Sequence, residues 1–421
     1  MFKDTRIAFK VYGCTLNQAD ALSVESFLKS NGFKVVEQID DADTVVVFSC
    51  AVRNETEDSI ISETKKILNQ GKKVVITSCL ANSRPGRLIN DLPNAVILIG
   101  GDNAEIVDAL RAKQGSVLYG KTTLKPAQPT SLIYPLKISQ GCTSNCYFCL
   151  TKLARPKLWC RPSSEIVNAV RSAVLSGSVE IDLTSMDSAD YFDPPATRLP
   201  QLIEKIVNEV EGNYKIRVGM MNPQGALKLF FDLKRALMFK KVFKFLHIPI
   251  QSGDINVVKD MNRNYDPLVV VQKIIELKQE IPNLMVATDI MVGYPTETQE
   301  AFEKSLKLIE SGVFDKIHMF RFTPRPHTKA ALLKQLDENL KKKRSEIASQ
   351  VIKKVQLEKH SFYAGKELSV LITNRIPNVR LEGRLDNYLK VYLPDRPALL
   401  GKEVIVRIDD YTPEHLIGRF L

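Results

Sequence analysis

Residues 138–149, with the sequence ISQGCTSNCYFC, decide the fold of the central part of this chain. They follow an apolar strand pattern and place three cysteines in one loop at the spacing Cys-x3-Cys-x2-Cys. Three thiolates at this spacing can bind one metal cluster. A structural zinc ion needs four ligands, and Cys160 is the only local candidate for a fourth. The loop therefore predicts a metal centre with an open coordination position, held by Cys142, Cys146 and Cys149.

A 4Fe–4S cluster held by three cysteines has such an open position. Its free iron can bind the amino and carboxylate groups of S-adenosylmethionine, and one-electron reduction then yields a 5′-deoxyadenosyl radical. We therefore interpret the loop as the ligand set of a catalytic iron–sulfur cluster. The alternative interpretation is a zinc knuckle or a group of buried thiols.

The chain after residue 134 alternates short apolar runs with stretches long enough for a helix. This rhythm predicts a partial α/β barrel, and a lysine-rich helix over residues 337–360 is expected to close it. Active sites of such barrels lie at the C-terminal ends of the strands, which is where the cysteine loop falls. The six runs are PLKIS, EIDLTS, KIRVGM, FKFLHIPI, LMVATDIMVG and KIHMFRF.

Residues 7–118 show the same rhythm and predict a parallel sheet of the Rossmann or flavodoxin-like kind. Cys14, Cys50 and Cys79 each follow an apolar run there. The carboxyl ends of parallel strands meet along one edge of a sheet, so these cysteines can come together despite about 30 intervening residues. They could share a second cluster, or they could be three small buried hydrophobic residues.

The last 60 residues contain short alternating runs and no helix pattern, which predicts a small antiparallel barrel of the oligonucleotide-binding kind. Residues 321–421 also carry a net charge of +8 out of the chain's +11. These charges either neutralise RNA phosphates or simply solvate a small domain. The candidates for RNA binding are Arg375, Arg380, Arg384, Lys390, Lys402 and Arg407.

The composition of the 421 residues, 44% hydrophobic and 25% charged, is that of an ordinary globular protein. No apolar run approaches the ~20 residues needed to cross a bilayer, and the first residues lack the apolar core of a secretory signal. We expect a cytoplasmic protein without a membrane partner. In that reducing compartment the seven cysteines favour metal-binding or catalytic roles over disulfides.

These segments together resemble the methylthiotransferases of the radical S-adenosylmethionine class over the whole length. YGCTLNQAD, SCAVRNETED and SCLAN resemble the family's three N-terminal cysteine segments, and ISQGCTSNCYFC resembles its radical motif. VGMMNP, FLHIPIQSGDINVVKDMNRNY and ATDIMVGYPTET resemble the branch that acts on threonylcarbamoyladenosine beside the tRNA anticodon in archaea and eukaryotes. The last 60 residues resemble the RNA-binding TRAM domain.

The resemblance implies two 4Fe–4S clusters and two uses of S-adenosylmethionine, one to methylate a sulfur and one to form the radical that removes hydrogen from C2 of the modified adenine. It also implies tRNA, a flavodoxin-like or ferredoxin-like electron donor and a sulfur source as partners. The N-terminal cysteines, here called the auxiliary triad, would hold the sulfur-carrying cluster. The loop cysteines, here called the radical triad, would hold the cluster that cleaves the cofactor.

We expect four segments along the chain: an N-terminal domain at residues 1–120, a linker at 121–133, a radical domain at 134–358 and a TRAM domain at 361–421. Polar residues and a glycine at barrel strand ends are candidates for cofactor binding: Thr184, Ser185, Asp187, Gln251, Ser252, Asp289 and Gly293.

Some positions depart from the family pattern or stay outside it. Met186 stands where relatives often have Glu or Gln, which questions amine recognition there. His327 stands where relatives have the glycine of Arg-Pro-Gly-Thr, which predicts a changed loop shape. His247 and His318 lie in apolar runs and are expected to be core histidines with satisfied hydrogen bonds. Cys160 receives no ligand role.

Three functions compete at this point. The first is methylthiolation of threonylcarbamoyladenosine at position 37 of tRNA. The second is the same chemistry on isopentenyladenosine in tRNA or on an aspartate of a ribosomal protein. The third is a non-catalytic RNA-binding protein with a structural metal, which would not cleave S-adenosylmethionine.

Overall fold

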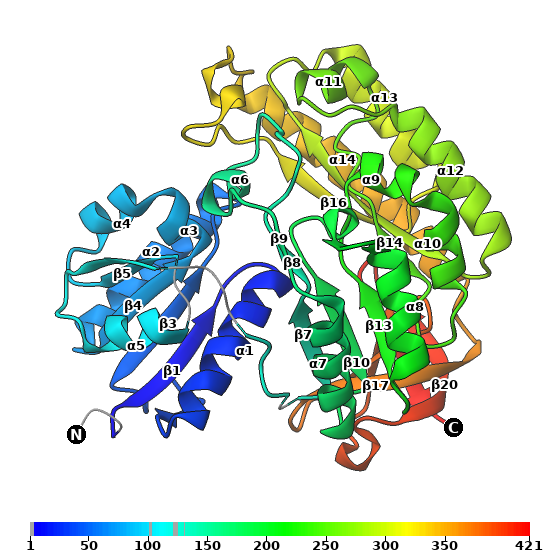
Figure 1. The fold of residues 1–421 in the computed structure, drawn as a ribbon. Helices are drawn as coiled ribbons and strands as arrows, with labels where there is room; N and C mark the ends of the chain where they lie inside the picture. Colours follow the sequence, from blue (N-terminus) through cyan, green and yellow to red (C-terminus); the bar gives the residue numbers. More distant parts are fainter. Residues whose placement is uncertain (1–3, 101–102, 121–124, 130) are drawn as a thin grey trace.

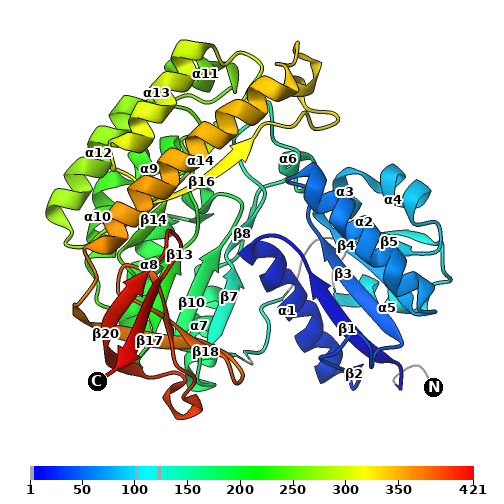
Figure 2. The ribbon, with the colours of Figure 1, turned by 180° about the vertical axis from the view of Figure 1, so that it is seen from behind.

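The computed structural model describes residues 4–100, 103–120, 125–129 and 131–421. Figure 1 shows an N-terminal domain beside a larger central half-barrel, with a small barrel beneath the central strands. The view from behind shows the long helix α14 (Glu338–Ser361) lying across the central part (Figure 2). Residues 121–124 and 130 of the predicted linker lie outside the described residues.

The N-terminal domain is a parallel sheet with helices on both faces, as predicted. Its strands pair in the order β2-β1-β3-β4-β5-β6. The central strand β3 (Thr44–Ser49, TVVVFS) is buried along its whole length because side chains on both of its faces meet helices. Val46 and Phe48 face α1 (Thr15–Ser30) and α5 (Asn103–Arg111), whereas Val45 and Val47 face α2 (Asn54–Asn69) and the short helices that follow. The other strands are β1 (Arg6–Val11), β2 (Lys34–Val35), β4 (Lys73–Ser78), β5 (Val96–Ile99) and β6 (Val117–Tyr119).

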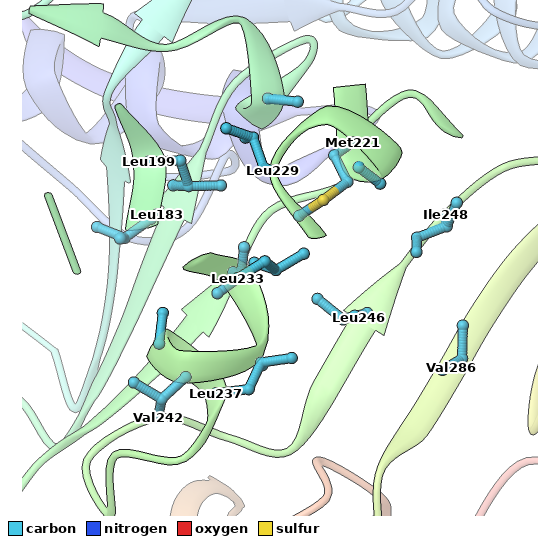
Figure 3. Close-up of a cluster of buried hydrophobic side chains, with 14 of the residues drawn as sticks. Leu183, Leu199, Met221, Leu229, Leu233, Leu237, Val242, Leu246, Ile248 and Val286 are labelled. Carbon is cyan, nitrogen blue, oxygen red and sulfur yellow. The ribbon is translucent and has the colours of Figure 1, made fainter. Parts of the chain in front are cut away.

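The central domain is the predicted partial barrel, because all six predicted runs form parallel strands. Two three-stranded sheets, β13-β10-β7 and β14-β15-β16, join where the amide of Phe243 donates to the carbonyl of Ile216 at 3.0 Å. Leucine and valine side chains pack between the strands and the outer helices (Figure 3). The strands are β7 (Ile133–Lys137), β10 (Glu180–Thr184), β13 (Lys215–Val218), β14 (Phe245–His247), β15 (Met285–Val292) and β16 (Lys316–Arg321).

The C-terminal domain is a closed barrel of five strands in the order β17-β18-β19-β21-β20. The last strand, LIGRF, is only five residues long. This strand pairs parallel with β19, so the barrel is not wholly antiparallel as predicted. The strands are β17 (Glu367–Ile376), β18 (Arg380–Arg384), β19 (Lys390–Leu393), β20 (Glu403–Tyr411) and β21 (Leu416–Phe420).

The C-terminal barrel packs against the N-terminal ends of the central strands. Phe245 and Met285, near the starts of β14 and β15, share a hydrophobic cluster with Leu385. The hydroxyl of Tyr388 donates to Glu180 at 2.9 Å, at the first residue of β10. The cysteine loop after β7 therefore lies at the opposite end of the strands from the small barrel. No helix among the described residues is both long and apolar enough to cross a membrane.

Candidate active site with two cysteine triads

The radical triad lies on a loop that neighbouring strand ends hold in place. Asp190 accepts two hydrogen bonds of 2.7 Å from Thr143, one from its amide and one from its hydroxyl. The side-chain amides of Asn222 and Asn262 donate to the hydroxyl of Ser144 at 2.7 Å and to the carbonyl of Asn145 at 2.8 Å. Three separate segments therefore fix the residues between Cys142 and Cys146.

The three thiols of this loop are half-buried and lie beside charged groups. Burial and the nearby Asp187 carboxylate raise the pKa of Cys142 to about 12. Burial also raises the pKa of Cys146 and Cys149, while the Arg263 guanidinium opposes that rise. A metal reverses this preference for the neutral thiol, because a coordinating thiol is deprotonated outright. A soft donor set of three thiols fits iron–sulfur ligation.

The auxiliary triad forms at the carboxyl edge of the N-terminal sheet. Cys14 precedes α1, Cys50 follows β3, and Cys79 is the first residue of α3 (Cys79–Ser83). The register aligns Ser49 with Ser78, so two of these cysteines occupy equivalent positions on adjacent strands. Burial raises the pKa of Cys50 to about 11, and the thiols of Cys79 and Cys14 add to the rise. The sheet thus brings the three predicted thiols together.

The backbone around this triad is unusually constrained. Gly13 has a φ of 95°, and a Cβ there would lie 3.0 Å from both Cβ and Sγ of Cys50. Ser78 has a φ of 76° and a ψ of −151°, a conformation that is essentially restricted to glycine and costs roughly 1–3 kcal/mol. Gly13 leaves room for the thiol, and the turn at Ser78 presents Cys79. This cradle of three thiols fits a second cluster.

The cofactor candidates after β10 lie beside the radical triad. Thr184 and Ser185 are buried, and the Ser185 hydroxyl lies 3.0 Å from that of Ser188. Asp187 accepts backbone hydrogen bonds of 3.1 and 3.0 Å from Ala189 and Asn222, so it has a structural role in the loop. Burial and the nearby Asp190 raise its pKa to about 6.

The candidates on the other half of the barrel lie mostly in internal contacts. Ser252 is fully buried, and its hydroxyl accepts a hydrogen bond of 3.1 Å from the amide of Asp254. Gln251 adopts a φ of 64°, and its amide donates to the carbonyl of Asp289 at 2.8 Å. A Cβ on Gly293 would lie 2.4 Å from Cγ of Lys341. Lys341 of α14 therefore packs closely against the backbone at Gly293, where the sequence predicted the close approach of a ligand.

A histidine pair shares one carboxylate oxygen on the barrel strands. Oδ1 of Asp289 lies 2.9 Å from Nε2 of His247 and 3.1 Å from Nδ1 of His318. Burial alone would raise the pKa of Asp289, but these two hydrogen bonds lower it to about 2. Both histidines have hydrogen-bond partners, as expected, but they are only partly buried, so the prediction that they lie in the core is wrong. Their shared partner was not predicted because residues of three strands contribute to the contact.

The His327 position keeps the backbone conformation of a glycine. Its φ is 65°, which lies in the left-handed region that glycine adopts without strain. A histidine therefore stands in a backbone conformation that usually favours glycine, and the predicted change of loop shape stays a prediction.

The basic residues of the small barrel fall into two groups. Arg375 forms a two-pronged ion pair with Asp395 at 2.7 and 2.8 Å. Arg384 has only 11% of its side chain exposed and faces Glu180 at 3.8 Å, so it joins two domains and is not part of an open surface. Other candidates remain near the surface: Arg380 stacked 3.6 Å over the Tyr392 ring, Lys390 3.7 Å from Glu382, and the exposed Lys402 and Arg407.

Comparison with known proteins identifies all three parts of the chain. Residues 6–100 match the uncharacterized protein family UPF0004, residues 136–309 the radical SAM superfamily and residues 361–421 the TRAM domain. The radical S-adenosylmethionine methyltransferase TsrM from Kitasatospora setae, with cobalamin and a [4Fe-4S] cluster bound, is 11% identical with a TM-score of 0.53. The match covers 78% of this chain and 77% of the TsrM chain, and it supports only the assignment of the fold.

Curated relatives extend over nearly the whole chain. A probable threonylcarbamoyladenosine tRNA methylthiotransferase of Archaeoglobus fulgidus is 36% identical, over 98% of each chain. A similarly named protein of Methanocaldococcus jannaschii is 32% identical, over 93% of this chain and 95% of its own. The threonylcarbamoyladenosine tRNA methylthiotransferase of Danio rerio is 31% identical, over 98% of this chain and 78% of its own. This chain therefore belongs to the threonylcarbamoyladenosine tRNA methylthiotransferase family, within the radical S-adenosylmethionine enzymes.

Proposed function

We propose that this protein modifies tRNA by adding a methylthio group to C2 of N6-threonylcarbamoyladenosine at position 37, using two 4Fe–4S clusters. The observation that carries the proposal is the pairing of two cysteine triads, one on the barrel loop and one on the N-terminal sheet edge, in a chain whose relatives bear that name. Between them lies α6 (Thr151–Ala154), directly after the radical triad (Figure 1).

The two triads have different roles in this proposal. Cys142, Cys146 and Cys149 would hold one cluster, which would supply the electron for reductive cleavage of S-adenosylmethionine, and the auxiliary triad would hold a second cluster for the sulfur to be transferred. Asp190, Asn222 and Asn262 orient the radical loop through the hydrogen bonds described above.

The barrel side chains orient the cofactor and the base. Asp289 stays ionised at neutral pH, so it offers a fixed negative charge to amino or hydroxyl groups of a ligand. The remaining candidates for cofactor contacts are Thr184, Ser185, Asp187 and Gln251, since Ser252 and Gly293 are occupied by contacts within the protein. The protein would act in the cytoplasm, with tRNA held partly by the small barrel, and it would draw on a flavodoxin-like or ferredoxin-like donor and a sulfur source.

Two tRNA substrates test this function directly. Reduced enzyme, S-adenosylmethionine and sulfide are incubated with tRNA that carries or lacks threonylcarbamoyladenosine, and the nucleosides are analysed by mass. Only the modified tRNA should gain a methylthio group, because a site built for the polar threonylcarbamoyl group leaves its own polar groups unpaired with plain adenosine. Better turnover with isopentenyladenosine tRNA or a ribosomal protein would overturn the substrate while keeping the chemistry.

A further inference from the structure

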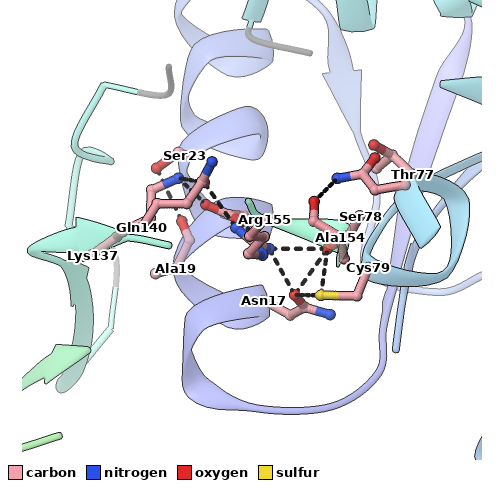
Figure 4. A network of polar contacts seen from close by, with 12 residues as sticks. Asn17, Ala19, Ser23, Thr77, Ser78, Cys79, Lys137, Gln140, Ala154 and Arg155 are labelled. Carbon is pink, nitrogen blue, oxygen red and sulfur yellow. Dashed lines mark hydrogen bonds and ion pairs between the residues drawn. The ribbon is translucent and has the colours of Figure 1, made fainter. Parts of the chain in front are cut away.

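A buried polar network joins the radical domain to the auxiliary triad. Its centre is Arg155, the residue that follows α6 and stands six positions after Cys149. Figure 4 shows its guanidinium between the helix that follows Cys14 and the turn that presents Cys79. Leu150, directly before α6, and Ala154, its last residue, pack in the hydrophobic cluster of the N-terminal domain. The loop of one triad is therefore anchored in the domain of the other.

The contacts of Arg155 nearly all reach the N-terminal domain. Its Nη2 donates to Asp20 at 2.7 Å and to Asn17 and Ser78 at 3.1 Å each. Burial alone would lower the pKa of this guanidinium, but the Asp20 carboxylate and the Cys79 thiol hold it above its ordinary value. Among the described residues, its buried Nε has no hydrogen-bond partner. In that part of the chain, a buried cation with one unpartnered N–H thus interacts with a predicted ligand thiol.

A second arginine of the radical domain reaches the same triad from another loop. Arg325, which follows β16, is 4% exposed, and its Nη2 donates to the carbonyl of Ala51 at 3.1 Å. It also contacts the side chains of Asn54 and Glu57. Burial lowers its pKa, and the nearby Cys50 thiol opposes that effect. Each of the two arginines therefore lies beside one cysteine of the auxiliary triad.

A cluster held by three thiolates carries net negative charge, and its environment must compensate that charge. Asp20 pairs with both Lys137 at 2.5 Å and Arg155 at 2.7 Å, so this buried group carries one positive charge in excess. Glu57 contacts three arginines, Arg325, Arg84 and Arg87, and Arg87 also pairs with Asp58 and Asp91. Arg155 and Arg325 are the arginines of these two groups that come from the radical domain. Both come from outside the domain that supplies the thiols.

We propose that Arg155 and Arg325 are positioning residues that complete the auxiliary cluster site across the domain boundary, so that the radical domain supplies the positive charge beside Cys79 and Cys50. This inference rests on the proposed two-cluster function and adds to it. Positive charge and N–H donors near a cluster raise its reduction potential, and loss of such outer contacts typically costs about 10–100-fold in metal affinity. The auxiliary cluster thus depends on correct docking of the two domains.

The test uses full-length protein in which the radical triad is replaced by alanine, so that only the auxiliary cluster can be loaded. Arg155→Met and Arg325→Met are made in this background, and the midpoint potential and the rate of iron release to a chelator are measured. Both variants should have a more negative potential and at least tenfold faster release. Arg155→Lys keeps the charge without the planar fork, so it should lie between Met and the parent.

Controls separate a local effect from misfolding. Arg217→Met removes a cation near Tyr388 at the far end of the barrel, and it should leave both measurements unchanged. Arg155→Met leaves Asp20 paired with Lys137 at 2.5 Å, and Arg155→Gln, which keeps hydrogen-bond donors without the charge, is the second variant if the methionine variant unfolds. Unchanged potential and release in the methionine variants would overturn this inference alone. Absence of any cluster in the parent background would instead overturn the two-cluster function.

Discussion

The two cysteine triads use opposite structural solutions for the same ligand chemistry. The radical triad fits into eight consecutive residues, and its loop is fixed by Asp190, Asn222 and Asn262 of the same domain. The cysteines of the auxiliary triad are spread over residues 14–79, and three adjacent strands are needed to bring them together. Arg155 and Arg325 of the radical domain also reach this site. A site made by one loop depends on local contacts, whereas a site made by a sheet edge depends on the whole tertiary structure.

Loss of one ligand from each triad should divide the chemistry completely. Cys142→Ala should abolish 5′-deoxyadenosine formation under reductant, because the proposal assigns cofactor cleavage to the radical triad at the barrel loop. Cys50→Ala should still cleave the cofactor but transfer no sulfur to tRNA. Quantification of 5′-deoxyadenosine and of the modified nucleoside by mass checks both. Equal loss of cofactor cleavage in the two variants would contradict the separate roles proposed for the two triads.

Iron content should fall by half when either triad is removed. Reconstituted protein should bind about 8 iron atoms, and alanine replacement of all three cysteines of one triad should leave about 4. Cys160→Ala is the matched control, because its half-buried thiol lies 3.4 Å from the amide of Phe192 and outside both triads. Loss of a whole cluster in that control would make Cys160 a ligand, and unchanged iron without the auxiliary triad would leave only one cluster.

Loss of basic residues on the small barrel should weaken tRNA binding and thereby sulfur transfer. This effect should not depend on either cysteine triad in particular. Replacing the exposed Lys402 and Arg407 with alanine should lower the logarithmic salt slope of tRNA binding by roughly 1.5, because each lost phosphate contact removes about 0.7–0.9. Arg375→Ala should have less effect, since Asp395 already pairs with that arginine. Affinity measured from low to physiological salt checks this. An unchanged slope in the double variant would place the RNA elsewhere.

The smallest expected effect concerns the loop that carries Arg325. His327→Gly should increase the free energy of unfolding by about 0.5–1 kcal/mol, because the left-handed backbone costs a histidine roughly 1–2 kcal/mol and the freer unfolded glycine chain cancels part of that gain. Urea denaturation measures the change. His327→Ala retains the strained Cβ and should give no stabilisation. If His327→Gly fails to stabilise the protein as well, the backbone strain assigned to His327 is wrong.

The sequence predicted the three folds well because each depends on a local repeating pattern. The six central strands and the lysine-rich helix are where the apolar runs placed them. The predicted sheet edge also brought Cys14, Cys50 and Cys79 together, since strand ends are readable from local pattern.

Contacts between distant residues were not predictable in this way. Arg155 and Asp20 are 135 positions apart, and nothing in either segment shows that they meet. The same holds for Arg384, whose charge suggested RNA but whose position under the barrel directs it to Glu180. Charge can be read from composition, but its partner depends on how the domains pack.

The docking of the small barrel under the central strands sets a minimum length for an RNA that touches both ends of the enzyme. Lys215 and Asp386 form an ion pair at 2.6 Å at this lower end, whereas the radical loop lies at the other end of the strands. Strand β15 has eight residues and therefore extends about 26 Å at ~3.3 Å per residue. A free nucleoside cannot bridge that distance, but a folded stem-loop can. If tRNA contacts both the small barrel and the radical loop, as proposed, its length contributes to recognition together with the chemistry of the base.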